Sequence, residues 1–121
     1  MKRLLPLLLF TLSPLLLFTS SKAQTLPPEG LPIPQIVAIA GTFQDDLGCP
    51  GEWNTDCENT YLALDSNSLI WRASFQIPAG SHEYKVALNG SWADNFGLSG
   101  EYYGPNIPLE LEETTLVTFY Y

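Results

Sequence analysis

Residues 84–96 bring together side chains that suit the recognition of a sugar. The stretch YKVALNGSWADNF contains Lys85 and Trp92, and the tryptophan is followed closely by Asp94 and Asn95. A pyranose ring has an apolar face of C–H groups on which an indole ring can stack, and its hydroxyl groups hydrogen-bond to ammonium, carboxylate and amide groups. The segment therefore predicts a stacking platform at Trp92 with a polar rim of Lys85, Asp94 and Asn95.

Other aromatic residues extend this candidate site. Tyr102 and Tyr103 stand together just before a Gly-Pro-Asn sequence and are candidates for a second sugar-stacking ring. Trp53 lies between the two cysteines of the chain, Cys49 and Cys57, and has two interpretations. It is either a further stacking ring or the side chain that packs the cysteine loop onto the domain, and we favour the packing role.

Residues that could act as catalysts are few. The single histidine, His82, is expected to be a solvated turn residue. Asp45-Asp46 and Glu112-Glu113 are adjacent carboxylates, and neighbours on a strand point to opposite faces instead of forming a glycosidase pair. Two thiols and one distant histidine do not make a zinc site. We therefore expect no catalytic residue, no metal site and no cofactor.

The rest of the chain predicts an all-β domain. Short segments of β-forming residues alternate with clusters of Gly, Pro, Asn, Asp and Ser, and none repeats its apolar residues at helical spacing for three turns after residue 24. The expected strands are IVAIAG (36–41), YLALD (61–65), IWRASFQI (70–77), EYKVALN (83–89), IPLEL (107–111) and TLVTFYY (115–121). The pattern is typical of an antiparallel β-sandwich of about six or seven strands.

The segments 70–77 and 83–89 are predicted to form a hairpin around the sequence Pro-Ala-Gly-Ser. Apolar and polar residues alternate along both segments, so one register sets every large apolar side chain on a single face. That register pairs Ile77 with His82, Phe75 with Tyr84, Ala73 with Val86 and Trp71 with Leu88.

The dipeptide Asn89-Gly90 predicts a two-residue type I′ turn, because both residues readily adopt positive φ. Extending the ladder through this turn pairs Leu88 with Ser91, Ala87 with Trp92 and Lys85 with Asp94. Trp92 then lies on the polar face beside Lys85. Two alternatives remain: an exposed platform, or a ring covered by a second sheet or a folded-back loop. Asn89-Gly90-Ser91 also matches the N-glycosylation pattern.

The N-terminus predicts export from the cytoplasm. Two basic residues precede an apolar stretch, residues 4–18, and small side chains end the segment at Ala23. This order is typical of a signal peptide over residues 1–23, and an anchored form is the weaker interpretation. A proline-rich linker over residues 24–35 and the sandwich over residues 36–121 follow. We expect a secreted, extracellular or periplasmic protein, without membrane attachment after signal cleavage.

Charge and cysteines narrow the function further. Without residues 1–23, Arg72 and Lys85 face thirteen carboxylates, which gives a net charge of 2 − 13 = −11. Such a surface repels phosphate backbones and anionic lipids, which excludes nucleic acid and membrane surfaces as partners. In an oxidising compartment Cys49 and Cys57 are expected to form a disulfide.

The strings AGTFQ, LGCPGEW to DC, IPAGSHEYKVALNGSW and ADNFG resemble the pullulanase-associated X module over residues 37–121. The resemblance implies an immunoglobulin-like β-sandwich that stands beside a glycoside hydrolase domain in secreted pullulanases and amylases. It also implies an α-glucan partner such as starch, glycogen or pullulan. The matching motif carries this role to Lys85, Trp92 and Asn95, and more weakly to Tyr102 and Tyr103.

Two functions from different classes follow. The first is a non-catalytic α-glucan-binding module with Trp92 as its platform. The alternative is a structural or protein-interaction sandwich that braces a catalytic domain without binding sugar.

Overall fold

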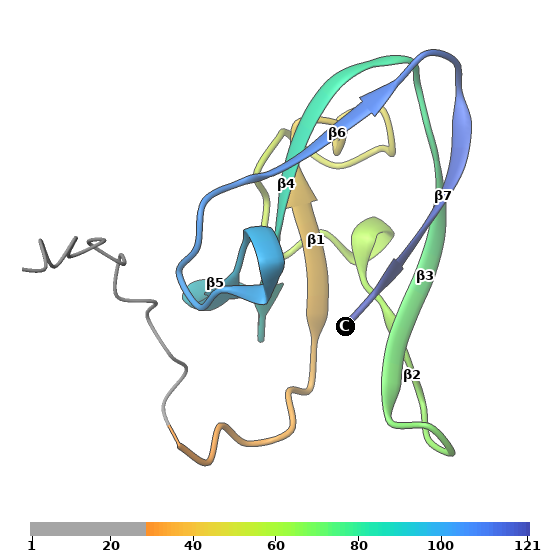
Figure 1. Cartoon of the computed structure of the whole chain (residues 1–121). Helices are drawn as coiled ribbons and strands as arrows, with labels where there is room; N and C mark the ends of the chain where they lie inside the picture. Colours follow the sequence, from red (N-terminus) through yellow and green to blue (C-terminus); the bar gives the residue numbers. More distant parts are fainter. Residues whose placement is uncertain (1–28) are drawn as a thin grey trace, which may run out of the picture.

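The computed structural model describes residues 29–121, which form two antiparallel sheets packed face to face (Figure 1). The seven strands are β1 (Val37–Gly41), β2 (Ala63–Asp65), β3 (Ile70–Ile77), β4 (Gly80–Leu88), β5 (Ser91–Phe96), β6 (Ile107–Leu111) and β7 (Thr115–Tyr120). Two 3-10 turns, η1 (Glu58–Thr60) and η2 (Leu98–Gly100), lie in the connections. No helix of the described part is long and apolar enough to cross a membrane. The predicted all-β, immunoglobulin-like antiparallel sandwich is confirmed.

The expected signal peptide, residues 1–23, and the first part of the expected linker, residues 24–28, lie outside the described residues. Residues 29–36 contain no strand. The backbone amides of Gln35 and Ile36 donate to Asn89 Oδ1 at 2.8 and 3.4 Å. The side chain of Asn89 therefore ties the entry of the domain to the β4–β5 turn.

Sheet A is built around β4. Strand β1 pairs with the C-terminal half of β4 on one side, while β5 and β6 share the other side of β4. This order follows from Tyr84, which pairs with both Gly41 of β1 and Ile107 of β6. Sheet B has the order β2-β3-β7.

The predicted hairpin between residues 70–77 and 83–89 is wrong. Strand β3 belongs to sheet B and β4 to sheet A, so the sequence Pro78-Ala79 turns a corner between the layers. The predicted facing of the side chains is nevertheless right, because Trp71 and Ile77 point into the core from one sheet and Val86 from the other. Period-two alternation specifies which face is buried, and it does not specify the partner strand.

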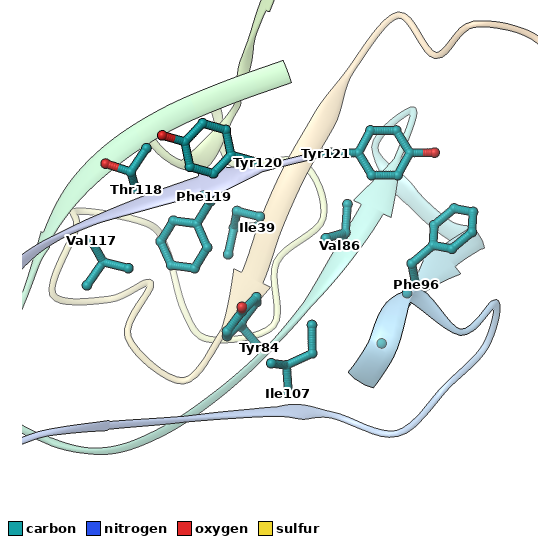
Figure 2. Close-up of a pocket in the computed structure, with 12 residues that line it drawn as sticks. Ile39, Tyr84, Val86, Phe96, Ile107, Val117, Thr118, Phe119, Tyr120 and Tyr121 are labelled. Carbon is teal, nitrogen blue, oxygen red and sulfur yellow. The ribbon is translucent and has the colours of Figure 1, made fainter. Parts of the chain in front are cut away.

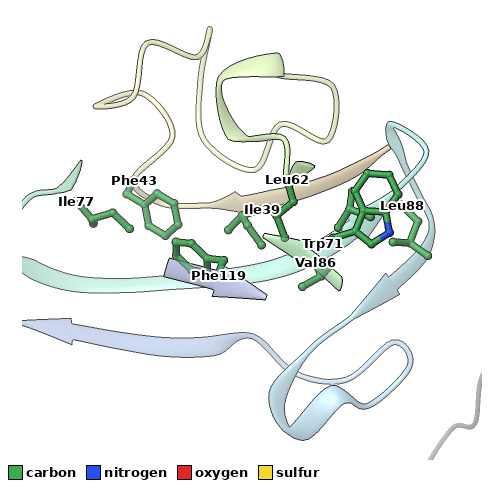
Figure 3. Close-up of a cluster of buried hydrophobic side chains, with 9 residues drawn as sticks. Ile39, Phe43, Leu62, Trp71, Ile77, Val86, Leu88 and Phe119 are labelled. Atoms are coloured by element: carbon green, nitrogen blue, oxygen red, sulfur yellow. The ribbon is translucent and has the colours of Figure 1, made fainter. Parts of the chain in front are cut away.

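The core fills the space between the sheets (Figure 3). Its buried cluster consists of Val37, Ile39, Phe43, Leu62, Trp71, Ile77, Val86, Leu88 and Phe119. The rings of Phe43 and Phe119 stack with centroids 5.9 Å apart, and Tyr84 meets Phe119 edge-on at 5.0 Å. Burial of each large apolar side chain contributes about 1.5–3 kcal/mol, so this cluster is the main force that holds the two sheets together.

The turn at Asn89 and Gly90 is confirmed, since their φ angles are 54° and 72°. Leu88 pairs with Ser91 as predicted, but the next pair is Ala87 with Asn95, so Trp92, Ala93 and Asp94 bulge out of the ladder. The predicted pairs of Ala87 with Trp92 and of Lys85 with Asp94 are therefore wrong. A bulge inserts unpaired residues into one strand and redirects their side chains, which no alternation pattern reports.

Candidate functional site

A long connection between β1 and β2, residues 42–62, covers part of the outer face of sheet A, the face turned away from the core. Gln44 organises it. This fully buried side chain accepts hydrogen bonds from the amides of Gly41 (3.2 Å) and Asn54 (2.7 Å). Its amide nitrogen, Nε2, donates to the Asn54 carbonyl oxygen (2.8 Å) and to Thr60 Oγ1 (2.9 Å). All four hydrogen-bonding positions of the amide are thus used to fix the connection.

The disulfide between Cys49 and Cys57 closes the middle of this connection and confirms the prediction. Trp53 lies inside the closed loop in a left-handed backbone conformation, with φ of 56°. Its amide donates to the Gly41 carbonyl oxygen at 3.2 Å, at the end of β1. The loop therefore presents Trp53 from a backbone that is fixed at both ends.

The bulge of β5 presents Trp92, whose side chain is 38% exposed. Asn95 Nδ2 donates to the Trp92 carbonyl oxygen at 2.9 Å, and the Ala93 amide donates to Ser91 Oγ at 3.2 Å. The Tyr103 hydroxyl donates to the Ala93 carbonyl oxygen. These bonds fix the three bulged residues without using the ladder, so the ring of Trp92 has a defined position.

A tyrosine–aspartate pair supports the same bulge. The Tyr102 hydroxyl donates to Asp94 Oδ1 at 2.6 Å, and the ring of Tyr102 is buried against Phe96. The bond to the Asp94 carboxylate is the main cause of a strongly raised pKa of Tyr102, because loss of the proton would place two negative charges together. Asp94 is therefore engaged with the protein instead of facing the solvent freely.

Trp53, Trp92, Lys85 and Asn106 line an open depression of about 340 Å³, which we name the tryptophan groove. The two indole rings lie with centroids 6.3 Å apart and planes inclined by 46°. Lys85 is half-buried, and this burial lowers its pKa. Asn106 Nδ2 donates to Glu83 Oε2 at 3.1 Å, which leaves its carbonyl oxygen for another partner.

The predicted site residues thus divide into two groups. Trp92 and Lys85 line the tryptophan groove. Asn95 is only 3% exposed and lies on the outer face of sheet A beside Ala87, where it holds the bulge from below. Tyr102 and Asp94 bond to each other, and Tyr103 is exposed with its edge against the Tyr102 ring.

Two residues of the groove are not among the sugar-binding residues that the sequence favours. Trp53, for which the sequence favours a packing role, lines the groove beside Trp92, with the ring centroids 6.3 Å apart. Asn106 comes from the connection before β6, and only the pairing of β6 with β4 brings it near Lys85. No local signal in the sequence could have identified Asn106, whereas the position of Trp53 in a short disulfide loop was such a signal.

The prediction for His82 is wrong as well. The ring is buried in the corner between the sheets and lies nearly perpendicular to the ring of Phe43, with the ring centroids 5.8 Å apart. Its Nε2 lies 2.9 Å from the Pro78 carbonyl oxygen, and its Nδ1 lies 3.4 Å from Thr42 Oγ1. Both ring nitrogens are used to fix the β3–β4 corner, so His82 is a structural residue.

Comparison with known proteins gives a consistent result. The family described as the pullulanase X25 domain matches residues 36–121. An amylopullulanase of Thermoanaerobacter thermohydrosulfuricus is 33% identical over 102 residues, which are 84% of this chain and 7% of that protein. An amylopullulanase of Thermoanaerobacterium saccharolyticum is 30% identical over 83 residues, which are 69% of this chain and 6% of that protein. This chain therefore corresponds to a small part of each of these relatives.

A solved structure shares the fold. The pullulanase from Bacillus acidopullulyticus aligns with a TM-score of 0.61 at 31% identity, over 71% of this chain and 10% of that one. The two-sheet architecture and the family match over nearly all the described residues agree with the motifs AGTFQ and ADNFG. The chain belongs to the pullulanase X25 domain family.

Proposed function

We propose that this chain is a non-catalytic module that binds α-glucan chains in the tryptophan groove. The observation that carries the proposal is the pair of tryptophans, Trp53 and Trp92, whose ring centroids lie 6.3 Å apart and which together line an open depression. Each ring offers an apolar face to a pyranose, and the groove is open enough for a polysaccharide to lie along it. A single shallow site of this kind gives an affinity of millimolar to micromolar order.

The inclination of the two rings favours an α-glucan over a flat glucan. Rings inclined by 46° accept two sugar faces that are turned relative to each other, as in a coiled α-linked chain. A flat β-linked ribbon would require nearly coplanar platforms. The angle therefore supports starch, glycogen or pullulan as the class of ligand.

Lys85 and Asn106 supply the polar contacts in this proposal. The ammonium group of Lys85 donates to sugar hydroxyl groups, and the free carbonyl oxygen of Asn106 accepts from them. Asn95, Asp94 and Tyr102 act from beneath by fixing the bulge that presents Trp92.

The wider setting is also a proposal. The relatives that match are amylopullulanases many times longer than this chain, which supports a neighbouring glycoside hydrolase domain as a partner. The buried disulfide supports secretion into an oxidising compartment, with a signal peptide over residues 1–23. The same relatives keep the alternative open that the module braces a catalytic domain without binding sugar.

Replacing Trp92 by alanine is expected to weaken α-glucan binding by about tenfold or more, because one of the two stacking faces is lost. The measurement is electrophoresis of the folded chain in native gels with and without amylopectin. Retardation by amylopectin should be strong for the unchanged chain and should nearly vanish for Trp92→Ala.

The matched control is Ile70→Ala, which removes a similarly exposed apolar side chain from the outer face of sheet B. It should leave retardation unchanged. A gel that contains hydroxyethyl cellulose should retard neither protein. Unretarded migration of the unchanged chain in amylopectin would reject the binding function and favour the bracing role.

Replacing Lys85 by methionine is expected to weaken α-glucan binding without lowering the stability of the folded chain. Burial lowers the pKa of Lys85, so between that pKa and the ordinary lysine value the unfolded chain binds more protons than the folded chain. Stability therefore rises with pH across that interval, and at neutral pH the charged lysine is unfavourable to the folded state. Lys85→Met should have an equal or slightly higher free energy of unfolding, with weaker retardation by amylopectin.

Urea unfolding at neutral pH and the same gels measure the two effects. Arg72→Met, which removes the exposed cation on sheet B, is the control and should change neither quantity. A destabilised Lys85→Met chain that binds amylopectin normally would show that Lys85 has a structural role instead.

A further inference from the structure

Within residues 29–121, the edges of the two sheets are protected with one exception. Strand β2 is only three residues long, β5 is interrupted by its bulge, and β6 carries Pro108 and Glu110. Strand β1 is covered along its free side, where Leu62 donates to the Val37 carbonyl oxygen at 2.8 Å. Short length, bulges, prolines and charges are the features by which proteins prevent association through strand edges. Among the strands of the described part of the chain, only β7 has none of these features.

The free edge of β7 presents a regular row of backbone groups. Trp71 and Tyr121 exchange both of their backbone hydrogen bonds at 2.9 Å, so every second residue before Tyr121 bonds to β3 in the same way. The amides and carbonyls of the residues between them, Leu116, Thr118 and Tyr120, therefore point away from β3. The strand reads TLVTFY and contains no charge, proline or glycine.

An apolar depression runs beneath this edge, between the two sheets (Figure 2). Its volume is about 510 Å³, and β7 contributes Val117 and Phe119 while sheet A contributes Tyr84, Val86 and Phe96. None of its lining residues is charged. The opposite side of the sandwich is closed, because Ala38 of β1 bridges to Tyr61.

We propose that β7 pairs in antiparallel fashion with β7 of a second copy of this chain, about a two-fold axis at Thr118. This register sets Leu116 opposite Tyr120 of the second copy and Thr118 opposite Thr118. In this register alone, the outward-pointing backbone groups of Leu116, Thr118 and Tyr120 all bond to the same three residues of the second copy. A shift of the axis to Val117 would instead set Tyr120 opposite Thr114, which lies outside the strand.

Side chains and charges agree with this pairing. The two exposed apolar residues of the strand, Leu116 (59% exposed) and Tyr120 (64% exposed), become cross-strand neighbours on the outer face. The acidic residues Glu112 and Glu113 precede β7, so an antiparallel arrangement keeps those of the two copies at opposite ends of the seam. The strongly negative chain is thus able to associate through a segment that carries no charge.

The pairing also bears on binding, and this consequence rests on the proposed function. A two-fold axis perpendicular to the sheets leaves the outer faces of sheet A on the same side of the dimer. Both tryptophan grooves then face one polysaccharide surface. Two linked sites retain a glucan more strongly than either site alone.

The first test is sedimentation equilibrium of the chain without sugar, over about 10 µM to 1 mM. These concentrations suit the weak association expected of a contact that buries only a strand edge. The apparent mass should double within that range. Thr118→Lys sets two lysines against each other at the axis and should weaken dimerisation at least tenfold. Ser74→Lys is the matched control, because it adds lysine to the same face and breaks the same Ser74–Thr118 hydrogen bond one strand away from the edge.

The second test is specific for the register. Thr118→Cys should form a disulfide between copies under mild oxidation, because opposed Cα atoms in a bonded pair lie about 5.5 Å apart. Leu116→Cys also introduces a cysteine at an exposed position, but it faces Tyr120 of the second copy and should not cross-link. A monomer throughout the concentration range, a dimer insensitive to Thr118→Lys, or equal cross-linking at both positions would each overturn the proposal. A monomer that is still retarded by amylopectin would overturn the dimer alone and leave the proposed function intact.

Discussion

Replacing Gln44 by leucine is expected to lower the free energy of unfolding by about 3–5 kcal/mol, since each buried partner left without a hydrogen bond costs about 1–3 kcal/mol. The substitution leaves the Gly41 amide and both backbone groups of Asn54 without their side-chain partner. It also removes the bond to Thr60 Oγ1 at 2.9 Å. Leucine has about the right size for the site, so the loss reports the hydrogen bonds more than a cavity.

Urea unfolding with linear extrapolation measures the effect. Gln76→Leu makes the same exchange at an exposed position on sheet B and should change stability by less than about 0.5 kcal/mol. Thr60→Val removes one partner of the network and should cost about 1 kcal/mol. If Gln44→Leu were no worse than Thr60→Val, the connection between β1 and β2 would be held by its disulfide and not by Gln44.

The fold was predictable from the sequence because its signals are local. Alternation of apolar and polar residues located six of the seven strands within a few residues, and Asn89-Gly90 located the turn that begins β5. The pairing of β3 was not predictable in the same way. Phe75 and Tyr84 both reach Phe119 from different sheets, and a single-sheet hairpin would have buried the same side chains. Long-range partners decide between these arrangements, and the alternation pattern contains no information about them.

The candidate site was predictable only where residues close together in the sequence form it. Lys85 and Trp92 stand on neighbouring strands joined by a tight turn, so strand parity placed them on one face despite the bulge. Trp53 and Asn106 come from connections far apart in the chain, and folding alone brings them to the same groove. Asn95 was recognised by its motif, but its buried side chain bonds to the Trp92 backbone. A motif therefore marked the right region without separating contact residues from supporting ones.

Replacing both Cys49 and Cys57 by alanine is expected to lower the free energy of unfolding by about 2–3 kcal/mol, the chain-entropy value for a loop of this length. The same change should weaken α-glucan binding, because Trp53 lies within the loop that the disulfide closes. The freed loop samples many conformations, and bound sugar must then order it at a cost in affinity. Trp53→Ala removes the ring itself, so its α-glucan affinity is the lowest that the double cysteine variant could show. Its stability should be nearly unchanged.

Comparing these two variants separates the roles of the disulfide. Gel retardation by amylopectin should decrease in the order unchanged chain, double cysteine variant, Trp53→Ala. The Gln44 network still ties Asn54, the next residue after Trp53, to the start of the connection when the disulfide is absent. Partial binding is therefore expected, and complete loss of binding in a folded double variant would assign the positioning of Trp53 to the disulfide alone. Unchanged binding, with Trp53→Ala still defective, would assign it to Gln44.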